Sequence, residues 1–189
     1  MQIVLIRHSN TKVEPEKYNP LWALNEKGIE NANVLAHNPL MQGIEVLYTS
    51  NQLKAIHTGV IVASKLGIFL KQNDDLTELT SLTNDWKGDY DGFINDIYSG
   101  TIERHTDGES LKEAGDRFTR VIEDIVSKES DRKVIGIVAH GNVLSLFASQ
   151  YESRSAFDIH NAIQMPDVAI LDWEHKTFSV RFGNYKHHD

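Results

Sequence analysis

Short apolar runs alternate along the chain with longer segments in which apolar residues recur at helical spacing. The runs are rich in β-branched residues, which predicts buried strands over residues 3–6, 46–49, 68–70 and 134–138. The intervening segments predict helices that begin near residues 26, 53, 111 and 143 and end before Pro39, at Gly67, near residue 126 and near residue 149. Either Ser50 or Asn51 is expected to cap the second helix.

The chain closes with a hairpin pattern. Ala169–Trp173 and Phe178–Phe182 are apolar segments on either side of the turn-like sequence Glu174–Lys176. Because a helix separates successive strands in the rest of the chain, we expect a mainly parallel sheet with helices on both faces. The expected fold class is therefore α/β, in three α/β/α layers, with the C-terminal hairpin adding an antiparallel edge.

Residues 79–107 interrupt this alternation. They show no sustained period and are punctuated by glycine, asparagine and aspartate, so at most a short helix is expected, over residues 93–98. Long ordered loops often carry function, and this excursion is expected to act as a lid or specificity segment of a single domain spanning residues 1–189. Four of its aromatic residues are expected to line an apolar wall: Trp86, Tyr90, Phe93 and Tyr98.

Composition narrows the classes of function. Hydrophobic residues make up 40% and charged residues 24% of the chain, as in an ordinary globular protein with a full-sized core. The net charge of −8 is spread without a basic block, which argues against nucleic acid or a membrane surface as a partner. The absence of cysteine excludes disulfides, thiolate metal sites and cysteine nucleophiles. The N-terminus lacks targeting features, so a cytoplasmic protein without a membrane span is expected.

Cationic residues follow the predicted strands. Arg7 and His8 come directly after the first strand, Lys54 lies shortly after the second, and His140 follows the most apolar one. Since ligands of open α/β sheets bind at the carboxyl ends of the strands, these side chains are expected to form a positive pocket for a small phosphorylated substrate. Gly141 has no side chain where the next helix begins, so backbone N–H groups there are expected to approach a phosphate oxygen.

The remaining histidines carry no comparable signal. They are not combined with acids at metal-ligand spacing, so neither a metal site nor a cofactor is expected. We interpret them as hydrogen-bonded or terminal residues: His37, His57, His105, His160, His175, His187 and His188.

Short motifs occur in order along the chain. Leu5–Thr11 is similar to an Arg-His-Gly-x-Thr signature with Ser9 in place of glycine, and Tyr48–Thr58 is similar to Ser-Ser-Pro-x-x-Arg-Ala-x-x-Thr with Lys54 in place of arginine. Further similar segments are Leu24–Gly28, Leu76–Leu79, Asp85–Gly88, Gly108–Ser110 and Val138–Gly141. Together they resemble the histidine phosphatase superfamily, the phosphoglycerate mutase-like proteins, over nearly the whole chain. The resemblance implies the phosphoglycerate mutase-like fold.

The resemblance also implies roles in catalysis. His8 would attack phosphorus and form a phosphohistidine that water then hydrolyses. Glu78 would protonate the leaving alkoxide and later take a proton from water.

The same resemblance implies a set of residues that bind the phosphoryl group. Arg7, Lys54 and protonated His140 would hold its oxygens and so supply most of the catalysis, which makes Arg7 and His140 catalytic as well as binding residues. Thr11 and Gly141 complete the expected substrate-binding set.

Three functions from different classes fit these residues. A metal-independent phosphomonoesterase acting on a small phosphorylated metabolite is favoured. A mutase would return the phosphoryl group to substrate, but mutases of this family are usually longer, with extra loops that exclude water. A catalytically weak module that binds a phosphorylated ligand or a protein is the third, because Lys54 offers a mobile point charge where arginine offers a planar fork.

Overall fold

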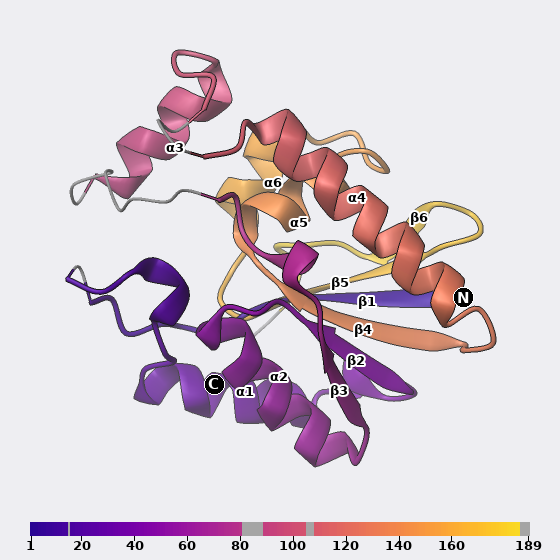
Figure 1. The fold of residues 1–189 in the computed structure, drawn as a ribbon. Coiled ribbons are helices and arrows are strands. Elements are labelled where there is room, and N and C mark those ends of the chain that lie inside the picture. Colours follow the sequence, from indigo (N-terminus) through magenta and orange to yellow (C-terminus); the bar gives the residue numbers. More distant parts are fainter. Residues whose placement is uncertain (15, 81–88, 105–107, 186–189) are drawn as a thin grey trace.

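In the computed structural model, which describes residues 1–14, 16–80, 89–104 and 108–185, the strands form a six-stranded sheet in the order β3-β2-β4-β1-β5-β6 (Figure 1). Strands β1 to β4 are parallel, whereas β5 is antiparallel to β1 and β6 is antiparallel to β5. The strands are β1 (Gln2–Arg7), β2 (Val46–Thr49), β3 (Phe69–Gln72), β4 (Val134–Ala139), β5 (Asp167–Asp172) and β6 (Thr177–Val180). The predicted α/β class, with a mainly parallel sheet and an antiparallel C-terminal hairpin, is confirmed.

Helices cover both faces of this sheet (Figure 1). On one face lie α1 (Glu26–His37) and α2 (Leu53–Leu66), and on the other lie α4 (Leu111–Lys128), α5 (Gly141–Ala148) and α6 (Ala156–Ala162). Helix α3 (Tyr90–Ser99) lies on the same side as α4, farther from the strands. Short 3₁₀ helices are η1 (Asn19–Leu21), η2 (Pro39–Met41) and η3 (Asp74–Leu76). Within the described part of the chain, these helices are too short or too polar to cross a membrane.

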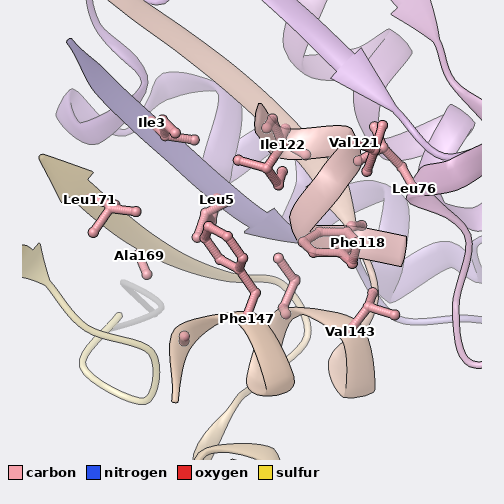
Figure 2. Close-up of a cluster of buried hydrophobic side chains, with 14 of the residues drawn as sticks. Ile3, Leu5, Leu76, Phe118, Val121, Ile122, Val143, Phe147, Ala169 and Leu171 are labelled. Carbon is pink, nitrogen blue, oxygen red and sulfur yellow. The ribbon is translucent and has the colours of Figure 1, made fainter. Parts of the chain in front are cut away.

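Each face of the sheet has its own hydrophobic core. Ile3 and Leu5 point into the core beneath α4 and α5, and Val4 and Ile6 point to the opposite face, because side chains alternate along a strand. Figure 2 shows Leu5 near Phe147 of α5, and the rings of Phe147 and of Phe118 of α4 pack edge to face with centroids 5.8 Å apart. This packing fixes β1, and with it His8 at the end of the strand.

Local signals account for the ends of several helices. Ser110 caps α4 in a capping box, in which Ser110 Oγ accepts from the Glu113 backbone N–H and the Glu113 carboxylate accepts from the Ser110 N–H at 2.8 Å. Helix α2 ends as predicted at Gly67, whose φ of 66° lies in the left-handed region that glycine adopts without strain.

Other local predictions were wrong. Gln52, and neither Ser50 nor Asn51, is the N-cap of α2, because Ser50 Oγ accepts from the Gln52 backbone N–H at 3.1 Å and forms a turn before the helix. Strand β3 is displaced toward the C-terminus, and α3 extends beyond residues 93–98 on both sides. Helix α6 was not predicted; its seven residues include a single buried one, too few for a detectable period.

Part of the excursion lies outside the described residues. Residues 81–88 and 105–107 are not described, so the expectations for Trp86, for the Asp85–Gly88 segment and for His105 are not addressed, nor are those for His187 and His188 at the C-terminus.

Candidate active site

Arg7, His8 and His140 meet because β1 and β4 are neighbours. The strands are parallel with Arg7 opposite Ala139, and the His8 backbone N–H donates to the Ala139 carbonyl oxygen at 3.0 Å. The rings of His8 and His140 therefore lie with centroids 5.1 Å apart. Two segments more than a hundred residues apart thus meet at one edge of the sheet, as their places after the strands predicted.

His8 is held in one tautomer. Its Nδ1 lies 2.8 Å from the backbone oxygen of Ser9, an atom that can only accept, so Nδ1 carries the proton and Nε2 carries the lone pair. Burial lowers the pKa of His8 well below its usual value, and the positive charges of Lys54 and Arg7 lower it further. At pH 7 His8 is therefore a neutral imidazole with a nucleophilic Nε2.

Contacts from α1 and α2 hold the loop that carries His8. The Ser9 backbone N–H donates to Thr58 Oγ1 of α2 at 3.0 Å. A Cβ at Gly28 of α1 would collide with the backbone oxygen of Asn10, so only glycine permits this close approach. The sequence motifs included Gly28 and Thr58, but only the structure gives them this supporting role.

His140 is fully buried beside His8. Its Nε2 lies 2.8 Å from Ser50 Oγ, and its Nδ1 has no hydrogen-bond partner among the described residues. Burial lowers the pKa of His140 well below its usual value, and His8 and Lys54 lower it further. His140 is thus neutral, and the protonated form expected from the sequence requires the negative charge of a bound phosphate.

Arg7 directs its guanidinium into the same site. Nη1 donates to the backbone oxygen of Ile163 at 2.7 Å, whereas Nε is buried without a partner in the described part of the chain. A Cβ at Gly141 would lie 3.2 Å from the guanidinium carbon, so Gly141 makes room for Arg7. An anion bound here would satisfy the remaining N–H donors of Arg7.

Glu78 caps the N-terminus of α5. Its Oε1 accepts from the backbone N–H groups of Leu79 at 2.8 Å and Val143 at 3.2 Å, and its Oε2 accepts from that of Asn142 at 3.1 Å. The N–H groups beside Gly141 that were expected to meet a phosphate oxygen instead donate to Glu78. Because Oε1 accepts two hydrogen bonds and Oε2 accepts one, Oε2 is the oxygen with a lone pair left to bind a proton.

Lys54 reaches the site from the first turn of α2. Nζ donates to Asn19 Oδ1, lies 3.4 Å from the Asn19 backbone oxygen and lies 5.7 Å from the centre of the Trp22 ring. Only 5% of its surface is exposed, and this burial lowers its pKa to about 8. Lys54 thus ties the segment containing η1 to the site and carries a charge that titrates close to neutral pH.

A cavity of about 390 Å³ joins these groups. Gly141, which lies against Arg7, is not among the lining residues. The other residues proposed from the sequence for catalysis or substrate binding all line the cavity: Arg7, His8, Thr11, Lys54, Glu78 and His140. The described residues contain no group of three or more histidine and acidic side chains placed to hold a metal ion.

Aromatic side chains form much of the remaining lining. Tyr90 and Phe93 line the cavity as expected. Tyr98 does not; its ring packs against Phe157 and His160 with centroid distances of 5.3 and 5.6 Å and attaches α3 to α6. Sequence reasoning also missed Tyr18, Asn19 and Trp22, which line the cavity from a loop whose only signal was two aromatic residues among polar ones.

Comparisons with known proteins agree with this architecture. The family model described as histidine phosphatase superfamily (branch 1) matches residues 3–186. The probable phosphoglycerate mutase GpmB of Yersinia enterocolitica is 26% identical over 165 residues, which cover 79% of this chain and 74% of that protein. The structure of Bacillus stearothermophilus YhfR superposes with a TM-score of 0.79 at 24% identity, covering 98% of both chains. The alpha-ribazole phosphatase from Shigella flexneri superposes with a TM-score of 0.75 at 21% identity, covering 98% of this chain and 96% of that one.

Proposed function

The chain belongs to the histidine phosphatase superfamily (branch 1), and we propose that it is a metal-independent phosphomonoesterase that acts through a phosphohistidine on a small phosphorylated metabolite. The observation that carries the proposal is the state of His8, which is a buried neutral imidazole. Its Nδ1–H donates to the Ser9 backbone oxygen, so Nε2 keeps its lone pair and is nucleophilic beside the cations Lys54 and Arg7. One of the structural relatives is named as an alpha-ribazole phosphatase, and a phosphatase activity of this chain would agree with that name.

The first step transfers the phosphoryl group to His8. Nε2 attacks phosphorus, the bond from phosphorus to the ester oxygen breaks, and the departing oxygen takes a proton from Oε2 of Glu78. Arg7, Lys54 and His140 stabilise the charge that spreads over the three non-bridging oxygens.

The second step returns the enzyme to its starting state. Glu78, now ionised, takes a proton from a water molecule whose oxygen attacks the phosphohistidine. The bond between Nε2 and phosphorus breaks, inorganic phosphate leaves, and the proton taken from water restores Glu78.

A mutase is the alternative that a specific observation favours, since the Yersinia relative is named as a probable phosphoglycerate mutase. A mutase would return the phosphoryl group to a second hydroxyl of the substrate instead of to water. Release of inorganic phosphate from 3-phosphoglycerate supports the phosphatase, and conversion to 2-phosphoglycerate without phosphate release supports the mutase.

We expect the protein to hydrolyse p-nitrophenyl phosphate at the same rate with and without EDTA. The cations that stabilise the phosphoryl oxygens are side chains, which a chelator does not remove. Release of p-nitrophenol measures the reaction. Loss of activity in EDTA that a divalent metal restores would contradict the metal-independent mechanism, and no hydrolysis in either condition would favour the weak binding module.

Glu78→Gln should slow the hydrolysis of alkyl phosphates about 10²-fold or more and affect p-nitrophenyl phosphate far less, because nitrophenolate leaves without protonation. The amide retains one oxygen for the hydrogen bonds now made by Oε1 but has no proton to transfer. Steady-state kcat/KM on both esters provides the comparison within a single variant, because it reports the steps up to phosphoryl transfer to His8 and excludes the later attack of water, which is common to both esters. Equal losses on both esters would mean that Glu78 acts by holding α5 in place, not by transferring a proton.

The pH dependence should report the charge of Lys54. Its pKa of about 8 means that Nζ is charged below that pH and neutral above it, so kcat/KM should fall as the pH rises through about 8. The fall in kcat should appear at higher pH, because bound phosphate favours the charged amine. We expect Lys54→Arg, which stays charged, to lose the alkaline fall when both proteins are measured between about pH 6 and pH 10. An unchanged profile would assign the fall to another group.

A further inference from the structure

The cavity has apolar walls beyond its phosphate-binding end. Val13, Tyr18 and Trp22 line it from the segment between β1 and α1, and Tyr90 and Phe93 line it from α3. The last two lie one turn apart on one face of the helix, with ring centroids 6.4 Å apart. Figure 1 shows this segment and α3 on the same side of the molecule, toward the carboxyl ends of β1 and β4.

The apolar surface continues to the mouth of the cavity. Val13 is 58% exposed and Tyr18 is 44% exposed, and Leu21 of η1, in the same segment, is 60% exposed. Several large apolar side chains exposed to solvent beside a cavity are typical of surfaces that contact a ligand.

The positive charges in the described part of the cavity lining suffice for one anionic group. Among the described lining residues, Arg7 and Lys54 are the side chains that carry positive charge at neutral pH. Gln52 Oε1 and Asn142 Oδ1 are also in this lining, as buried acceptors without a partner in the described part of the chain. A second anionic group on a substrate would meet these acceptors, and burying it without a further cation is costly.

We infer that the site selects phosphate monoesters whose organic part is apolar and carries no second anionic group. With the phosphate against Arg7 and Lys54, an aryl or aralkyl group would lie against Trp22, Tyr90 and Phe93, where aromatic contacts add to the burial of apolar surface. A cavity of about 390 Å³ falls in the size range of small-molecule sites. The inference rests on the proposed function and adds the class of leaving group to it.

Matched alkyl esters test this selection, because their leaving groups differ little in acidity. Phosphate release should give a kcat/KM for 2-phenylethyl phosphate that is about 10-fold or more above that for ethyl phosphate. The value for 3-phosphonooxypropanoate, which carries a carboxylate, should be about 10-fold or more below that for propyl phosphate.

Two variants link the selection to the walls. Phe93→Ala should lower the ratio of phenylethyl to ethyl ester toward one, and so should Val13→Asp, which changes an exposed side chain and leaves the core intact. Phe69→Ala, on β3 outside the cavity and 81% exposed, is the matched control that should keep the wild-type ratio.

The outcomes separate the inference from the proposed function. Hydrolysis of both esters with a ratio near one, or a wild-type ratio in both Phe93→Ala and Val13→Asp, would overturn the inference and leave the phosphatase standing. Faster hydrolysis of the carboxylate ester would also overturn it. Failure to hydrolyse any ester would overturn the proposed function and the inference with it.

Discussion

Replacing His8 by alanine is expected to lower kcat by about 10⁴-fold or more, the scale on which loss of a covalent nucleophile acts. The other described imidazole in the lining of the cavity, that of His140, is not free to take over, because its Nε2 is engaged by Ser50 Oγ at 2.8 Å. The fold should survive, since the His8 side chain lines the cavity and lies outside both hydrophobic cores.

Rapid quenching at neutral pH with ³²P-labelled substrate measures the intermediate directly, because phosphohistidine is lost in acid. Label should appear on wild type and be absent from His8→Ala. His175→Ala, which changes an exposed histidine in the turn before β6, is the matched control and should keep both the label and the activity. Equal turnover by wild type and His8→Ala would refute the phosphohistidine mechanism.

What the sequence predicted depends on local signals. β1 and β4 are dense apolar runs. Ser110 followed by Glu113 is a capping box, whose hydrogen bonds form within a single helical turn. The position of His8 and His140 followed from a further rule, that the carboxyl ends of parallel strands share one edge of the sheet. Those parts of the site therefore required no knowledge of side-chain packing.

The remainder of the site depends on contacts between distant residues. Glu78 caps α5 through Asn142, 64 residues away, and Lys54 meets Asn19, 35 residues away in a loop without any period. Neither pairing has a signature in a single sequence, because each depends on how loops distant in the sequence pack against the sheet. For this reason the sequence predicted that the N-terminus of α5 and Lys54 contact only phosphate, whereas the structure gives each of them a protein partner.

Lys54→Ala is expected to cost about 3 kcal/mol in kcat/KM, which is about 10²-fold, by analogy with deleting one preorganised donor to a developing anion. Lys54→Arg should equal or exceed wild type, since a guanidinium keeps the charge and adds a second directed hydrogen bond. Lys65→Ala, an exposed lysine in the last turn of the same helix, is the matched control and should change little. An inactive wild type that gains activity in Lys54→Arg would identify a phosphatase fold that has lost efficient catalysis.

The contact between Lys54 and Asn19 allows a second explanation of a loss in Lys54→Ala, namely that lysine acts only by holding the η1 segment over the site. Asn19→Ala separates the two, because it removes the contact and leaves the ammonium in the cavity. If Lys54 binds phosphate, Asn19→Ala should lose far less kcat/KM than Lys54→Ala, since the freed Nζ can turn to the substrate. Equal losses in both variants would make Lys54 a positioning residue, and full activity in Lys54→Ala would show that neither role matters to the reaction.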